Sequence, residues 1–145
     1  MVFKKRSVIE RLKKLEEVLS KLKDKAGVAL EEYRWSTDTQ WIIERGLELA
    51  SSAIFDIGNH ILSGVYRTSV EEYEQILEKL HEKGVISKEL YEELRGLGGF
   101  QNILVHGYLG LDPELVYYHF KKALHAFPRF IAEIEEWLES LPCNS

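Results

Sequence analysis

Residues 98–113 read Gly-Gly-Phe-Gln-Asn-Ile-Leu-Val-His-Gly-Tyr-Leu-Gly-Leu-Asp-Pro, and the rest of the chain is organised around this stretch. It combines adjacent glycines, a Gln-Asn pair, an apolar turn, a histidine and a tyrosine. The Asp-Pro pair that closes it is a strong start signal for a final helix. The sequence on either side has the ordinary pattern of amphipathic helices. Polar groups here occupy positions that a helical bundle does not need, so this stretch is the candidate functional segment.

The flanking sequence predicts an all-α fold. Apolar residues recur at three- and four-residue spacing, and no segment alternates as a strand would. Four of these segments begin with a candidate N-cap side chain, namely Ser36, Ser69, Ser87 and Asp112. We expect helices over about residues 7–24, 36–63, 69–84, 87–105 and 112–141. Five helices favour an up-and-down bundle, and 145 residues fit a single domain spanning 1–145.

Composition limits the classes of function. The net charge is -5, yet residues 1–35 carry +4 and residues 36–145 carry -9. A protein whose whole surface followed nucleic acid would be basic, so any contact with RNA must be local. Cys143 is the only cysteine, which suits a reducing compartment. Neither a signal-peptide pattern nor a membrane-length apolar run is found, so we expect a cytoplasmic protein without membrane contact.

Spacing within the central stretch suggests chemistry. If the helix from Ser87 continues to about Val105, Asn102 and His106 are one turn apart and can contact the same ligand. Arg95 lies on the same stripe but about 16 Å along the axis from His106, too far to share one phosphate. A histidine that titrates near neutrality is a common general acid or base. The alternative is that His106 only caps the helix end and that the nearby tyrosine packs in the core.

These groups suffice for RNA cleavage without a metal, in which the 2′-hydroxyl attacks the adjacent phosphate and the enzyme moves protons and stabilises charge. Asp56 and His60 lie four residues apart on another helix, but two ligands without a third indicate a metal only weakly. A hydrogen-bonded Asp–His pair is the preferred interpretation. The chain has no glycine-rich phosphate loop and no Cys-x-x-Cys motif. We therefore expect neither a cofactor nor a metal.

A family resemblance adds to this reading. Residues 99–108 (Gly-Phe-Gln-Asn-Ile-Leu-Val-His-Gly-Tyr), followed by Leu-Asp at 111–112 and Val-Tyr at 116–117, resemble the signature of HepT-like proteins of the HEPN superfamily. The order of helices resembles the family over about residues 7–138, and the motif is specific over residues 99–117. The family motif is arginine, four residues, histidine, any residue and tyrosine. His106 and Tyr108 match it, and Asn102 matches the polar residue after the arginine.

The resemblance implies a helical bundle that dimerises and brings two motifs to a shared cleft, where RNA is cut without a metal. Many members are toxins paired with a small MntA-type nucleotidyltransferase antitoxin, which transfers AMP to the motif tyrosine, here Tyr108. Such a modification would add negative charge at the cleft and repel RNA phosphate. The implied partners are a second copy of the chain, this antitoxin and RNA. Asp56 stands on the second long helix, where such proteins often place an acidic residue facing the motif.

The chain departs from the family at the arginine position, which holds Gln101. Glutamine lacks the permanent charge and the two-pronged geometry that fits phosphate, and losing such a contact typically costs about a hundredfold or more in rate. Arg95 and Arg67 are alternative sources of the charge. Three hypotheses follow: a ribonuclease toxin acting through His106, Asn102 and Gln101; a binding module that has lost cleavage; and a structural helical dimer with a buried histidine.

Overall fold

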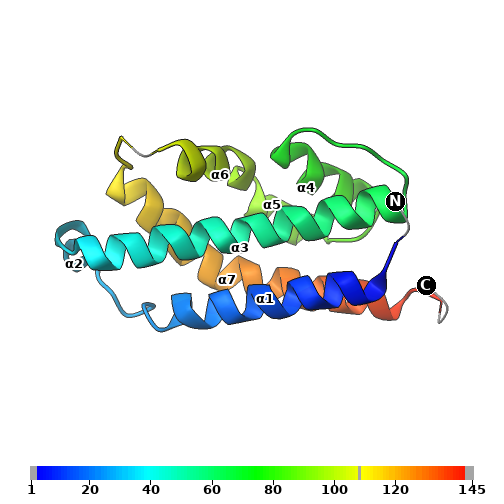
Figure 1. The fold of residues 1–145 in the computed structure, drawn as a ribbon, viewed down its shortest axis with the longest axis horizontal. Coiled ribbons are helices and arrows are strands. Elements are labelled where there is room, and N and C mark those ends of the chain that lie inside the picture. The colour runs from blue at the N-terminus through cyan, green and yellow to red at the C-terminus, as the bar shows by residue number, and fades with distance from the viewer. Residues whose placement is uncertain (1–2, 108, 143–145) are drawn as a thin grey trace.

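The computed structural model describes residues 3–107 and 109–142, and these form α-helices without a strand. The predicted all-α class is thus confirmed. Seven helices are described where about five were expected. Figure 1 shows α1, α3 and α7 running alongside one another, with α4, α5 and α6 packed against them and α2 at one end. The bounds are Lys5–Lys23 for α1, Leu30–Trp35 for α2, Thr37–Gly64 for α3, Tyr73–Glu82 for α4, Lys88–Leu94 for α5, Leu97–His106 for α6 and Pro113–Glu139 for α7.

Three of the predicted N-caps are confirmed. The side chains of Ser36, Ser87 and Asp112 each accept a hydrogen bond from a backbone N–H in the first turn of α3, α5 and α7. The predicted cap at Ser69 is wrong, because α4 begins only at Tyr73. Tertiary packing sets that start: the Tyr73 ring stacks on Phe55 of α3, with the ring centroids 4.7 Å apart. An aromatic contact to another helix outweighs a local capping signal here.

The helix expected over residues 87–105 is divided into α5 and α6. Arg95 has an extended backbone, with φ of -58° and ψ of 137°, and Gly96 has φ of 91°, a left-handed conformation that favours glycine. The break resets the direction in which side chains of α6 point. Arg95 therefore does not share a helical stripe with Asn102 and His106.

Glu74, in the first turn of α4, holds the start of α6. Its carboxylate accepts hydrogen bonds from the backbone N–H of Gly96 at 2.9 Å and of Gly98 at 3.4 Å. Negative charge at this position also complements the positive end of the helix dipole. A Cβ at Gly98 would lie 2.6 Å from the backbone nitrogen of Glu74. The glycines before the motif thus allow the backbones of α4 and α6 to approach closely.

The core lies between the long helices and is closed by α4, α5 and α6. Its largest fully buried side chains come from α1, α2, α3 and α7 and are Leu15, Leu22, Tyr33, Ile43, Leu47, Ile54, Ile57, Ile61, Leu62, Phe120, Phe127 and Phe130. In the described part of the chain, no helix combines the length and apolar character needed to cross a membrane. The core leaves one face of α6 uncovered, and the candidate site lies on that face.

Candidate functional site

Asn102 and His106 lie one turn apart on the outer face of α6, and both side chains are exposed. The opposite face of the helix is anchored by Leu97 and Phe100, which are buried. His106 is the last residue of α6, where a positive charge is favoured by the negative end of the helix dipole. The interpretation of His106 as a core residue is therefore wrong. The two side chains are available to the same ligand, as their spacing predicted.

A shallow depression of about 440 Å³ adjoins this pair, between the end of α6 and the start of α7. A Cβ on Gly107 would lie 2.6 Å from the carbonyl oxygen of Ile103 and would overlap the Leu111 side chain. Glycine at this position is what lets the chain turn tightly after His106. Tyr108 follows directly and lies outside the described residues. The depression is lined by Asn102, Ile103, His106, Gly107, Gly110, Leu111, Asp112 and Leu115.

Gln101 does not join Asn102 and His106. Its side chain is only 1% exposed and points at α3. Its Nε2 donates to the hydroxyl of Ser52 at 2.7 Å and to the carbonyl of Glu48 at 3.3 Å. Its Oε1 is buried without a hydrogen-bond partner among the described residues. Gln101 thus stands at the arginine position of the motif and links α6 to α3 by hydrogen bonds.

Asp56 and His60 are held separately, by the N-terminal part of the chain. Asp56 accepts a hydrogen bond from Nε of Arg11 on α1 at 2.5 Å. His60 Nε2 accepts from the backbone N–H of Lys4 at 3.4 Å, and its ring lies 5.6 Å from that of Phe3. These contacts replace the predicted Asp–His hydrogen bond. They turn the carboxylate of Asp56 toward α1, and Asp56 does not line the depression beside Asn102 and His106.

The two arginines considered as substitutes for the motif arginine lie away from His106. Arg95 joins α5 to α6 at the far end of α6, with its guanidinium 6.0 Å from the ring centre of Tyr91. Arg67 follows the C-terminal end of α3, with φ of 53°. Within the described ranges, no three His, Cys, Asp or Glu side chains are grouped so that they could hold a metal ion.

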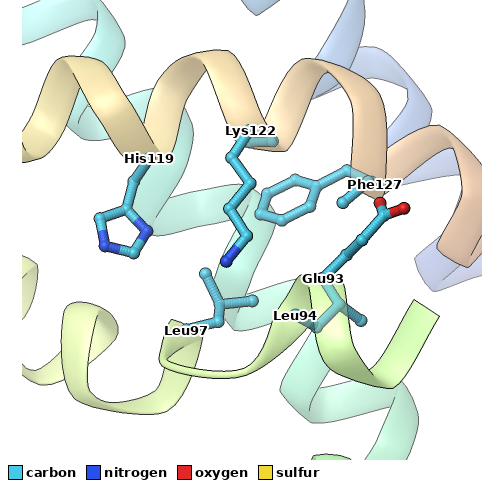
Figure 2. Close-up of a pocket in the computed structure, with 8 residues that line it drawn as sticks. Glu93, Leu94, Leu97, His119, Lys122 and Phe127 are labelled. Atoms are coloured by element: carbon cyan, nitrogen blue, oxygen red, sulfur yellow. The ribbon is translucent and has the colours of Figure 1, made fainter. Parts of the chain in front are cut away.

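A second crevice, between α5, the start of α6 and α7, is shown in Figure 2. Its volume is about 10 Å³, room for about one water. His119 borders it and stacks on Phe100 of α6, with the ring centroids 3.9 Å apart. Burial, followed by the nearby charge of Lys122, lowers the pKa of His119. The stacked ring of this histidine holds α6 against α7, a role that the sequence did not indicate.

Comparisons with known proteins show the family of this chain. Residues 9–134 match the HepT-like family, described as "Ribonuclease HepT-like". The chain is 32% identical over 132 residues to the tRNA nuclease HepT of Aphanizomenon flos-aquae, covering 90% of this chain and 89% of that one. Among solved structures, the cytosolic protein YutE of Bacillus subtilis matches with a TM-score of 0.80 and 25% identity, over 97% of this chain and 94% of that one.

A toxin from a toxin–antitoxin complex also has this fold. The tri-AMPylated HEPN toxin of Shewanella oneidensis, solved in complex with an MNT antitoxin, matches with a TM-score of 0.77 and 20% identity. The match covers 89% of this chain and 96% of the toxin. On the extent of the family match and the identity to the cyanobacterial nuclease, this chain belongs to the HepT-like family.

Proposed function

We propose that this chain is the ribonuclease toxin of a toxin–antitoxin pair and cuts RNA without a metal. The observation that carries the proposal is the exposed Asn102–His106 pair beside an open depression. Membership in a family that includes a tRNA nuclease makes RNA the substrate that best fits this pair. Because the chain is acidic apart from its first 35 residues, the contact with RNA is confined to this site.

The reaction is an attack of a ribose 2′-oxygen on the adjacent phosphorus. A bond forms between the 2′-oxygen and phosphorus, and the bond from phosphorus to the 5′-oxygen breaks. The products are a 2′,3′-cyclic phosphate and a free 5′-hydroxyl. His106 accepts the 2′-hydroxyl proton or, when protonated, donates one to the leaving oxygen, which are the usual roles of histidine in general acid–base catalysis. Asn102 donates a hydrogen bond to the phosphate or ribose.

A second copy of the chain completes the cleft in this proposal. Large apolar side chains are exposed on α3 and α6 around the site, which is the kind of surface that marks a protein contact. Pairing these faces about a two-fold axis would bury them and bring two copies of His106 into one cleft. One imidazole could then accept a proton while the other donates. The exposed side chains are Trp41, Ile42, Ile103 and Val105.

The regulatory partner is a MntA-type nucleotidyltransferase that transfers AMP to Tyr108. Support comes from the Shewanella oneidensis toxin, which shares this fold and was solved AMPylated with its antitoxin. Tyr108 is two residues from His106, so a nucleotide phosphate attached there would add negative charge beside the RNA site. Incubation with the antitoxin and ATP is expected to modify wild-type protein and to leave Tyr108→Phe unmodified. Modification at another residue would refute this part of the proposal.

An alternative is a binding module that keeps the antitoxin partner but no longer cleaves RNA. The buried position of Gln101 favours it, because the motif's arginine position contributes no charge to the site. Gln101→Arg tests the alternative. Conversion of an inert protein into a nuclease by this change would favour the binding module over native catalysis.

Cleavage in the presence of EDTA tests the main proposal. Wild-type protein is expected to cut bulk tRNA, and His106→Ala is expected to abolish cutting. His125→Ala is the matched control, since that histidine is also exposed on a helix but pairs with Glu93, away from the depression. Wild-type cleavage no greater than that of His106→Ala would overturn the ribonuclease proposal.

A further inference from the structure

The direction of α6 relative to α3 is fixed by contacts at two points. At its start, α6 packs against the first turn of α4, where Tyr73 stacks on Phe55 of α3. Near its middle, Gln101 contacts Glu48 and Ser52, which precede Phe55 on α3. Moving forward along α6 therefore means moving backward along α3. The two helices are antiparallel neighbours, as Figure 1 shows.

This arrangement brings His106 to the level of Arg45. His106 lies five residues after Gln101, about 7.5 Å along α6 at 1.5 Å per residue. Arg45 lies five residues before the midpoint between Glu48 and Ser52, which is also about 7.5 Å along α3 in the same direction. Packed helix axes are about 8–10 Å apart. His106 is exposed on the outer face of α6 and Arg45 is exposed on α3, so a phosphate that lies across the solvent side of the two helices can contact both side chains.

The side chain of Arg45 is free to make such a contact. Arg45 and Ser52 are seven residues apart and so share one stripe of α3, the stripe that meets α6. The Arg45 side chain is 65% exposed, and its described ion-pair partner is Glu48, one turn away at 3.2 Å. An exposed pair of this kind contributes little to stability and is readily exchanged for another anion.

We infer that Arg45 supplies the phosphate-binding charge that Gln101 does not. The guanidinium contacts a non-bridging oxygen of the phosphate that reacts, while His106 takes the proton of the attacking 2′-hydroxyl or gives one to the leaving 5′-oxygen. The guanidinium stabilises the negative charge that builds on the phosphate in the transition state. Arginine is suited to this role by its permanent charge and its paired N–H donors. The inference rests on the proposed ribonuclease function and adds a residue to its site.

Glu48 competes with RNA phosphate for the Arg45 guanidinium, so a change at Glu48 should change the affinity for RNA. The carboxylate of Glu48 holds Arg45 in the free protein, whereas its backbone carbonyl accepts the Gln101 hydrogen bond. Glu48→Gln therefore removes the competing anion and leaves the fastening of α6 to α3 intact. RNA affinity is expected to rise several-fold in this variant, because RNA phosphate no longer displaces a carboxylate.

RNA binding and cleavage together test the inference. Binding of a fluorescein-labelled single-stranded RNA is measured in His106→Ala protein, so that the probe stays whole. Adding Arg45→Ala to that protein is expected to weaken binding about tenfold and to reduce the slope of log affinity against log salt by about one. In the otherwise wild-type protein, Arg45→Ala is expected to lower kcat about a hundredfold or more. Arg45→Lys is expected to keep the salt slope and recover only part of kcat, because lysine keeps the charge but not the paired donors.

Arg6→Ala is the matched control, because Arg6 is an exposed arginine paired with a glutamate one turn away on α1. If Arg45→Ala and Arg6→Ala have the same RNA affinity, salt slope and kcat, the inference is overturned, but the ribonuclease proposal stays in place. Protein that binds the RNA through Arg45 yet never cuts it would support the phosphate contact and refute the ribonuclease. Absence of both binding and cleavage would refute both.

Discussion

Replacement of Gln101 by methionine and by alanine separates a structural role from a chemical one. Methionine fills the same space, loses two hydrogen bonds worth about 1 kcal/mol each, and removes a buried unpaired oxygen whose cost is about 1–3 kcal/mol. These terms nearly cancel, so Gln101→Met should unfold within about 1 kcal/mol of wild type. Alanine also leaves a cavity, and buried Met→Ala changes cost about 2–5 kcal/mol. Gln101→Ala should therefore be the less stable variant by at least about 2 kcal/mol.

Urea denaturation followed by circular dichroism measures the difference, and cleavage of tRNA by the same samples measures the chemistry. Gln101→Met is expected to retain cleavage within a few-fold of wild type, since the side chain faces α3 and not the depression. If Gln101 acted on RNA, Gln101→Met would keep its stability but lose cleavage. Equal stability of the two variants, combined with loss of cleavage in both, would refute the assignment of Gln101 as a fastening residue.

Three further tests address the packing of the helices. Gly107→Ala should destabilise the fold by about 1–3 kcal/mol, because the added methyl group overpacks the turn after α6. Gly99→Ala is the control and should be neutral or stabilising, because its methyl group projects into open space. The urea midpoints of both variants measure the effect. Tyr33→Phe removes a buried hydroxyl that has no partner among the described residues, so thermal melting should rise, by about 2–4 °C if 1 kcal/mol is gained. The lowered pKa of His119 means that the unfolded chain binds its proton more readily, so stability should fall as pH drops through the ordinary histidine range. His119→Phe, which keeps a ring against Phe100, should reduce that fall, and an unchanged pH profile would argue against the assignment.

The parts of the fold that were predicted from sequence are those set by local interactions. The caps at Ser36, Ser87 and Asp112 involve a side chain and a backbone N–H within three residues, so the signal and the structure occupy the same few positions. The failed cap at Ser69 and the break at Gly96 depend on contacts between helices far apart in sequence. No local pattern reports that a carboxylate at position 74 will cap a helix that begins more than twenty residues later.

The inward direction of Gln101 did have a sequence signal. Leu97, Gln101 and Leu104 are spaced four and three residues apart, which is the spacing of one helical face. The two leucines belong to the packed side of α6, and the glutamine lies between them. A polar residue on an apolar stripe is more often a buried hydrogen-bonding group than a reactive one.

The distribution of charge bears on how RNA is held. Glu44 and Glu48 flank Arg45 on α3, and burial raises the pKa of the Glu44 carboxyl. With few cations near His106, each protomer can neutralise only one or two phosphates. For single-stranded RNA the salt slope is about 0.7 per phosphate, so a dimer should show a slope between about -1 and -3. A titration of affinity against salt measures it directly, and a slope steeper than about -5 would mean that RNA instead follows the basic helix α1.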